Sequence, residues 1–224
     1  AGTRQLIGYI VQSVPSRKRV RKRLLALLPP AVVVEDGGPP PGSPWRGYQL
    51  CLGAFLESEL SHAVIVQDDT FVCQNFEAGV ERVAAIFPDH PVCLFYPGLK
   101  MRSARGRQKA VQARRSFFLL DRQDFVPMVA VLWPRAKAEH FLNWTQGRTI
   151  PGLQEPYRSD DAVAGSWMRH TKQAVYVTMP SLVEHPDDVA PVKDGHHKAA
   201  YGADKGRIAH SFHAGDPLDL DWSV

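Results

Sequence analysis

The chain has 224 residues, of which 44% are hydrophobic, and its net charge is +4 at pH 7. These values allow one sizeable core, and no run approaches the roughly 20 apolar residues of a membrane helix. Cys51, Cys73 and Cys93 are odd in number and lie in apolar segments, which favours reduced core thiols over disulfides or a zinc site. Because no signal-peptide pattern is visible, we expect a cytoplasmic protein that is not bound to a membrane.

Short apolar runs alternate with segments of helical periodicity. Between residues 20 and 28, for example, valine and leucine recur at i, i+4, i+7 and i+8, and a proline pair ends this helix. Predicted strands cover residues 6–11, 31–34, 62–66, 92–96 and 128–133, and predicted helices cover residues 20–28, 45–60, 76–87 and 135–144. This alternation predicts a single α/β domain with a mostly parallel central sheet flanked by helices. Neither G-x-x-x-x-G-K-[ST] nor G-x-G-x-x-G occurs, which argues against Walker-type NTPases and dinucleotide oxidoreductases.

Two adjacent carboxylates follow the apolar run at residues 62–66. The tripeptide Gln67-Asp68-Asp69 stands where the predicted strand leaves the core, and open α/β sheets bind ligands at the carboxyl ends of their strands. Two neighbouring anions are stabilised by a cation between them, and hard oxygen ligands suit Mg²⁺ or Mn²⁺. A solvated turn is the alternative, because aspartates are common in turns.

Two later segments end in residues of related chemistry. Ser159 or Asp160 is a predicted helix N-cap, which places Asp160 and Asp161 in the first turn, near the positive end of the helix dipole. Residues 175–185 are predicted to form a strand that breaks at a proline and delivers His185, a possible metal ligand. Plain capping and an ordinary surface or core histidine are the structural alternatives.

Together these segments resemble a known family. The strand that ends in an xDD version of the DxD motif, the D-D-x(5)-W pattern at residues 160–167 and Pro-Ser-Leu-Val-x-His at residues 180–185 are similar to GT-A glycosyltransferases, which use nucleotide-sugar donors. The resemblance spans roughly residues 5 to 190. It implies a GT-A-like catalytic domain over residues 1–190, and we expect residues 191–224 to form a C-terminal tail packed on the same domain.

The resemblance also implies roles for individual residues. Asp69 and His185 would bind the Mn²⁺ or Mg²⁺ ion that bridges the diphosphate of the donor, for which a UDP-sugar is expected. Asp68 would be oriented toward the sugar or the ribose. Asp161 matches the catalytic base of inverting members, and Asp160 would lie against the acceptor.

The ends of the first two predicted strands would complete the donor site. By the resemblance, the loop with Ser16 and Arg17 wraps the nucleotide, and Asp36 binds its base or ribose. A helix start with free backbone N–H groups and a guanidinium suits a diphosphate. For Asp36, a turn before a glycine pair is an equal alternative. Gln67 departs from the family, since an acidic residue is common at this first motif position.

Basic residues concentrate in two segments. Residues 17–23 hold six and residues 100–115 hold seven, so the rest of the chain is net acidic. The first segment fits the solvated face of a helix, whereas the second lacks a sustained apolar period and is predicted to be a mobile loop. Such a loop, with Arg105, Arg107 and Arg114, can grip a polyanion through phosphate contacts.

This basic segment makes DNA a candidate acceptor. Glycosylation of a hydroxymethylated base, as in phage DNA hypermodification, would combine it with the transferase motifs and place the protein in a bacterial or phage-infected host cell. Trp167 of the D-D-x(5)-W pattern is a further expected acceptor contact. Saccharide, lipid or protein acceptors remain open, because the same loop can close over the donor diphosphate. A nucleotidyltransferase and a non-catalytic nucleic-acid-binding module are the remaining alternatives, and the oligomeric state is not determined.

Overall fold

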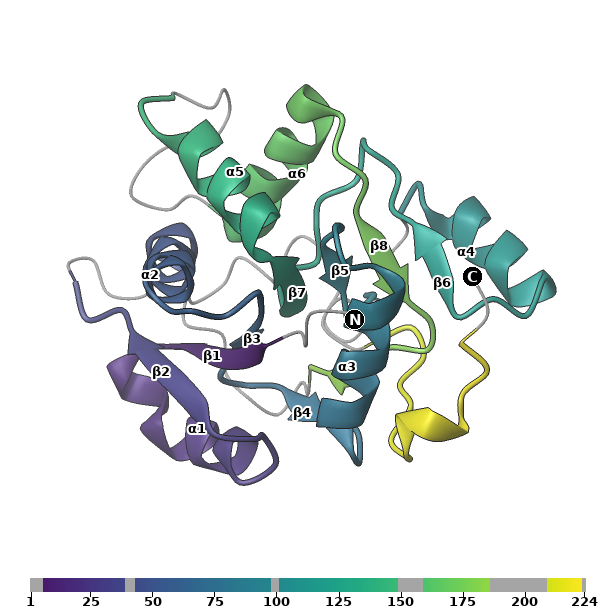
Figure 1. Ribbon diagram of the computed structural model, residues 1–224, viewed down its shortest axis with the longest axis horizontal. Coiled ribbons are helices and arrows are strands. Elements are labelled where there is room, and N and C mark those ends of the chain that lie inside the picture. Colours follow the sequence, from purple (N-terminus) through teal and green to yellow (C-terminus); the bar gives the residue numbers. More distant parts are fainter. Residues whose placement is uncertain (1–5, 39–42, 98–100, 149–158, 186–208, 223–224) are drawn as a thin grey trace, which may run out of the picture.

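A central seven-stranded sheet organises the part of the chain that the computed structural model describes, residues 6–38, 43–97, 101–148, 159–185 and 209–222 (Figure 1). The sheet order is β2-β1-β3-β7-β5-β8-β6. Its strands are β1 (Ile7–Ser13), β2 (Ala31–Glu35), β3 (His62–Gln67), β5 (Val92–Cys93), β6 (Phe117–Leu119), β7 (Ala130–Pro134) and β8 (Tyr176–Thr178). β7 and β6 oppose the direction shared by the other five strands. The predicted mostly parallel α/β sheet is therefore confirmed.

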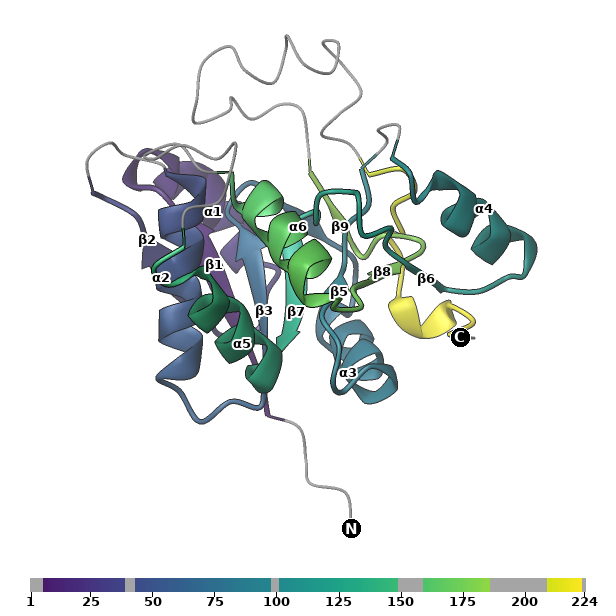
Figure 2. The same ribbon diagram turned by 90° about the horizontal axis from the view of Figure 1, so that it is seen from above.

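Helices cover both faces of this sheet (Figures 1 and 2). The bounds of the helices around it are α1 (Lys18–Leu25), α2 (Pro44–Leu56), α3 (Phe76–Ile86), α5 (Arg135–Thr145) and α6 (Asp160–Thr171). In Figure 1, α2, α5 and α6 lie above the sheet, and α1 and α3 lie below it. No helix in the described ranges combines the length and the apolar character that a bilayer crossing requires.

The alternation of side chains along the strands separates two hydrophobic cores. On one face, Ile10 of β1 and Ile65 of β3 pack with residues of α2, α5 and α6. On the other face, Val11 and Val66 pack with residues of α1 and α3. Because successive strand residues point to opposite faces, a strand covered on both sides needs apolar residues at every position. This accounts for the continuous apolar run in β3.

The register of the parallel strands brings their carboxyl ends to one edge. Gln12 pairs with Gln67, and Ser13 pairs with Glu35, so β1, β2 and β3 end side by side. The residues that immediately follow these strands therefore meet in space although they are far apart in the sequence. This edge is where open α/β sheets bind ligands.

A second, two-stranded sheet lies next to this edge. The predicted strand over residues 175–185 divides at Pro180 into β8 and the short β9 (Val183–Glu184). β9 pairs with β4 (Phe71–Val72), which follows β3 closely, and Phe71 lies opposite Glu184. The antiparallel pairing directs the residue after Glu184 back toward the end of β3.

The basic segment is largely helical, so its prediction as a mobile loop is wrong. Residues 104–112 form α4 (Ala104–Gln112), of which only Ala110 is buried, and this explains the missing apolar periodicity. The helix start is held from outside: the buried carboxylate of Asp124 accepts hydrogen bonds from the N–H groups of Arg102 (2.9 Å) and Ser103 (2.8 Å). A cap supplied from about 20 residues away is not visible in a local sequence pattern.

The C-terminal residues 209–222 pack along the side of the domain that carries β6 and β9. The N–H group of His210 donates to the carbonyl of Tyr96 at 2.8 Å, and Ser181 donates its N–H to the carbonyl of Ser211 at 2.8 Å. A short helix, η2 (Pro217–Asp219), contacts α3. Residues 191–208 of the expected tail lie outside the described residues.

Candidate active site

The carboxylate of Asp68 is held by the end of β1 and the turn that follows it. Ser13 donates its hydroxyl to Oδ2 at 2.7 Å, the N–H of Val14 lies 3.4 Å from the same oxygen, and Arg17 donates to Oδ1 at 3.0 Å. Burial raises the pKa of Asp68 above its ordinary value, and the contacts with Ser13 and Arg17 oppose this rise. Asp68 thus has a fixed orientation, while its contact with a sugar or ribose stays a prediction.

Asp69 lies beside His185, as the pairing of β4 with β9 requires. His185 Nε2 is 3.3 Å from Asp69 Oδ1, and both residues are buried. Neighbouring ligands of an octahedral divalent ion, each about 2.1 Å from the metal, are about 3 Å apart. A carboxylate and an imidazole at this separation therefore fit two adjacent positions around an ion such as Mn²⁺.

Asp69 and His185 alone do not form a complete metal site. Among the residues that the structure describes, no group of three or more histidine, cysteine, aspartate or glutamate side chains is placed to hold a metal ion. Mg²⁺ in nucleotide enzymes is commonly held by one or two carboxylates together with substrate phosphates. Binding of a metal–diphosphate complex by Asp69 and His185 stays a prediction.

Arg17 connects the two carboxylates. It closes the 3-10 turn η1 (Pro15–Arg17), and its Nη1 lies 3.0 Å from Asp68 Oδ1 and 2.7 Å from Asp69 Oδ2. The guanidinium compensates two buried anions that would otherwise repel each other. Ser16, next to it, is exposed. A guanidinium also pairs well with phosphate oxygens, so a bound diphosphate and the carboxylates would compete for Arg17.

Asp36 follows β2 but is already engaged in an ion pair. Arg46 of α2 donates from Nε to Oδ1 at 2.8 Å and from Nη2 to Oδ2 at 3.0 Å, and Gly38 donates its N–H to Oδ1 at 3.2 Å. The two hydrogen bonds from the guanidinium of Arg46 hold the turn after β2 against the start of α2. The expected contact of Asp36 with a base or ribose remains a prediction. No motif pointed to Arg46, which lies ten residues further along the chain.

The carboxylates of Asp160 and Asp161 both titrate above the ordinary range of aspartate. Burial raises the pKa of Asp160 to about 7, with a further contribution from the charge of Asp161, and burial raises the pKa of Asp161 to about 6. Both residues open α6, where Asp161 accepts hydrogen bonds from the hydroxyl of Ser159 and the N–H of Ala162. Asp160 is buried, whereas Asp161 is partly exposed and is the more accessible of the two.

Gln67 links the end of β3 to this pair of carboxylates. A hydrogen bond from its side chain opposes the rise in the pKa of Asp160. An acidic residue at position 67 would instead add another anion next to Asp160 and Asp161. Glutamine at this position, where the resembled motifs commonly have an acidic residue, thus gives Asp160 a hydrogen bond without a further negative charge.

Trp167 does not contact an acceptor directly, and this expectation is corrected. Its side chain is completely buried in the core between α5 and α6, where its ring centroid lies 5.7 Å from that of Trp133 and 5.1 Å from that of Phe141. Its Nε1 donates to Nδ1 of His140 at 3.1 Å. The spacing from Asp160 to Trp167 therefore reflects how α6 is anchored in the core.

The structure places the expected acceptor arginines away from the strand-end site. Arg105 and Arg107 lie on α4, and Arg114 follows its last turn. Arg105 and Arg114 are exposed, and Arg107 is half-buried. Helix α4 packs near β6, the edge strand opposite β2, as Figure 2 shows. These arginines thus form a separate group from Asp69, Asp161 and their neighbours.

Comparison with known proteins gives no family assignment. No protein family matches the sequence, and no curated protein matches it. Among solved structures, 41 chains are similar. One of them, the crystal structure of A197 from STIV, is 16% identical, has a TM-score of 0.46, and the match covers 84% of this chain and 100% of that chain. A likeness at this level carries no conclusion about activity.

Proposed function

We propose that the protein is a metal-dependent glycosyltransferase that moves a sugar from a nucleotide-sugar donor, expected to be a UDP-sugar, to an acceptor hydroxyl. The observation that carries the proposal is the separation of 3.3 Å between Asp69 Oδ1 and His185 Nε2 at the carboxyl ends of the strands. Residues 67–69 connect this pair to the start of α6, where Asp161 has a raised pKa. The proposed metal ligands and the candidate base are thus linked through Gln67 and Asp160.

The chain's own residues account for the remaining steps. When bound, the divalent ion would neutralise the charge that develops on the departing nucleoside diphosphate. When the donor binds, the guanidinium of Arg17 would release the carboxylate of Asp69 and pair with a diphosphate oxygen instead. Asp161 would accept the proton of the acceptor hydroxyl while the acceptor oxygen bonds to the anomeric carbon and the bond to the diphosphate breaks, which gives inversion.

The environments of the two carboxylates favour Asp161 over Asp160 as the base. A general base works best when its pKa is close to the working pH and its carboxylate is reachable. Asp161 is partly exposed and, with a pKa of about 6, is mostly ionised at pH 7. Asp160 is buried, so an acceptor hydroxyl reaches its carboxylate less easily, and burial and the charge of Asp161 both raise its pKa. Perturbed carboxylates in such a position are typical of functional sites.

Calorimetric titration with UDP in the presence and absence of Mn²⁺ tests the metal assignment. We expect Mn²⁺ to strengthen UDP binding to the parent protein, and Asp69→Asn and His185→Gln each to reduce this gain at least about tenfold, since each removes one of two protein ligands. The control is Asp89→Asn, an exposed aspartate near the amino end of β3. A gain from Mn²⁺ that both site variants retain would rule out the assignment.

Product analysis separates glycosyl transfer from its closest rival. Incubation with candidate donors should release a nucleoside diphosphate. Release of pyrophosphate would instead identify a nucleotidyltransferase that uses the same carboxylates. The acceptor need not be identified for this measurement, because slow hydrolysis of the donor by water releases the same diphosphate product.

A further inference from the structure

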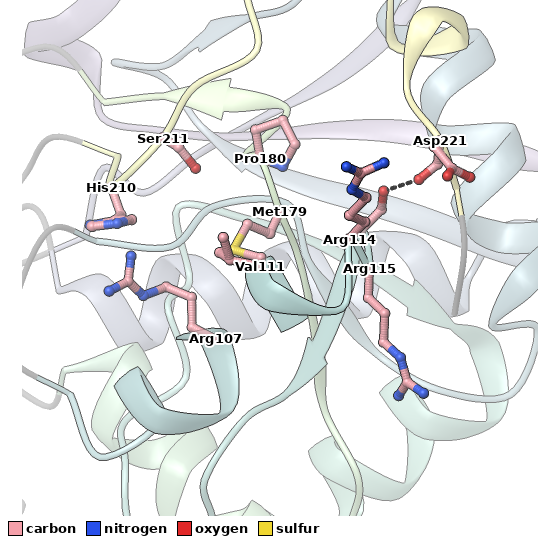
Figure 3. A pocket seen from close by; sticks show the side chains of 10 residues that line it. Arg107, Val111, Arg114, Arg115, Met179, Pro180, His210, Ser211 and Asp221 are labelled. Atoms are coloured by element: carbon pink, nitrogen blue, oxygen red, sulfur yellow. Dashed lines mark hydrogen bonds between the residues drawn. The ribbon is translucent and has the colours of Figure 1, made fainter. Parts of the chain in front are cut away.

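A basic pocket lies at the edge of the sheet opposite β2 (Figure 3). It is formed by α4 and the residues after it, the connection between β8 and β9, and the C-terminal residues 209–222. Its volume is about 400 Å³. This is more than a single phosphate group needs and lies within the range of sites that bind small molecules or single nucleotides.

Positive side chains dominate the wall of this pocket. Arg107, Arg114 and Arg115 line it together with His210, and Asp221 is the one acid among the described lining residues. Figure 3 shows the guanidinium of Arg107 next to the imidazole of His210. Within the described residues, Nε of Arg107 is buried and has no hydrogen-bond partner. The neighbouring guanidinium groups repel one another, and a bound anion would relieve this repulsion and supply an acceptor for Nε of Arg107.

The backbone of Arg114 supports a role for its side chain. Arg114 has a φ of 52°, and the N–H of Arg115 donates to the carbonyl of Ala110 at 2.8 Å, which is a Schellman-type helix end. Glycine is the favoured residue at this left-handed position, because a Cβ is strained there. The arginine therefore makes the helix end less stable than glycine would. It also places a cation at the pocket.

The remaining wall is apolar. Val111 of α4 is 55% exposed, and Met179 and Pro180 line the pocket with it. Arginines beside exposed apolar side chains suit a ligand that has both phosphate oxygens and flat, weakly polar faces, as the bases and sugars of a nucleic acid do. An acidic peptide would use the cations but would leave the apolar wall uncovered.

We propose that this pocket binds one nucleotide unit of a DNA strand, with Arg107 and Arg114 at the phosphate and the Val111 side of the wall against the base or sugar. That the bound DNA is also the acceptor of glycosyl transfer rests on the proposed function. The binding itself does not, because it requires neither donor nor metal.

The test is fluorescence anisotropy with a labelled oligonucleotide, as single strand and as duplex, over about 50 to 200 mM NaCl without donor or metal. Arg107→Gln and Arg115→Gln remove pocket cations. Arg105→Gln is the matched control, because it removes the same charge from an exposed position on the same helix that does not line the pocket. The parent protein should lose DNA affinity as the salt concentration rises over this range. In each pocket variant this fold-loss should be smaller than in the parent by a factor of about 3, which is the contribution of one phosphate contact.

The Arg114→Gly variant distinguishes the loss of a pocket cation from a loss of folding. It removes a pocket cation and places the favoured residue at the left-handed position, so its melting temperature should equal or exceed that of the parent while its DNA affinity falls. Weaker DNA binding in this variant cannot then be explained by a damaged helix.

Three results would overturn the proposal. Equal effects of Arg105→Gln and Arg107→Gln would indicate diffuse attraction to a basic surface. Unchanged DNA affinity in all pocket variants would exclude the pocket. Competition by a poly-glutamate peptide as strong as competition by unlabelled DNA would indicate a site for acidic peptides. None of these results bears on Mn²⁺-dependent UDP binding, so failure of this inference and failure of the proposed glycosyltransferase activity are distinguishable.

Discussion

At the scale of single residues, the carboxylates at the strand ends and at the start of α6 differ in what stabilises their charged forms. Asp68 accepts hydrogen bonds from Ser13 and Arg17, which stabilise its charged form. Asp160 and Asp161 have no arginine or lysine among the causes of their pKa shifts, and burial dominates both. Burial raises the pKa of all three carboxylates, and only for Asp68 does an arginine oppose the rise.

Asp161→Asn should bind UDP and Mn²⁺ normally but transfer sugar about 10²- to 10⁴-fold more slowly, because an amide cannot accept the proton. In the parent, only the ionised base is active, so kcat/KM should fall as pH drops below about 6, the pKa of Asp161, and level off above about 7. Initial rates from about pH 5 to 8, at about half-unit steps, measure this profile.

Asp160→Asn is the matched comparison for the base assignment. It removes a buried carboxylate one residue away and should reduce turnover less than Asp161→Asn does. A larger loss in Asp160→Asn, with near-parental turnover in Asp161→Asn, would assign the role of base to Asp160 instead.

At the scale of elements, most strands and the site-bearing helix were predictable, whereas the short strands β4 and β6 and the cross-contacts were not. The run at residues 62–66 and the cap before Asp160 are local signals, and β3 and α6 formed where they indicate. The contact of Gln67 with Asp160, in contrast, joins residues that are far apart along the chain. No periodicity carries such information, because it depends on how helices are placed on the sheet.

Helix α4 is a whole element that the local sequence pattern did not indicate. Its sequence is basic and buries only Ala110, so its periodicity was too weak to indicate a helix. Its stability comes from Asp124, whose carboxylate accepts two backbone N–H groups and the hydroxyl of Ser103 before the first turn. A weakly amphipathic helix can form where a distant buried carboxylate satisfies its unpaired N–H groups.

Asp124→Ala should therefore lower the free energy of unfolding by about 2 to 4 kcal/mol, since it leaves the buried N–H of Ser103 and its hydroxyl without their acceptor. Urea denaturation measures the change, and hydrogen exchange over residues 101–115 should accelerate more than exchange in α2. Asp121→Ala is the control, because the side chain of Asp121 is exposed and accepts one local N–H, that of Gln123. Equal destabilisation by both substitutions would remove Asp124 as the anchor of α4.

At the scale of the whole molecule, the C-terminal residues 209–222 join elements that are distant along the chain. They form a bridge to Pro97 through Ala209, exchange backbone hydrogen bonds with Ser181, and place Trp222 against Phe117 with ring centroids 5.4 Å apart. They also form one wall of the basic pocket. The segment is thus part of the folded unit and of the site inferred there.

A chain that ends at residue 208 should consequently unfold more easily, by about 3 kcal/mol or more, because it exposes Phe117 and leaves several backbone groups to water. Thermal and urea unfolding of the shortened and full chains measure the difference. Trp222→Ala isolates the apolar part and should account for about 1 to 2 kcal/mol, since Trp222 is only partly buried. DNA affinity should fall with the truncation, which removes His210, but not with Trp222→Ala, whose side chain is not part of the pocket wall. If the shortened chain unfolds at the same temperature and urea concentration as the full chain, the segment does not contribute to stability. The pocket would then lack a stable wall.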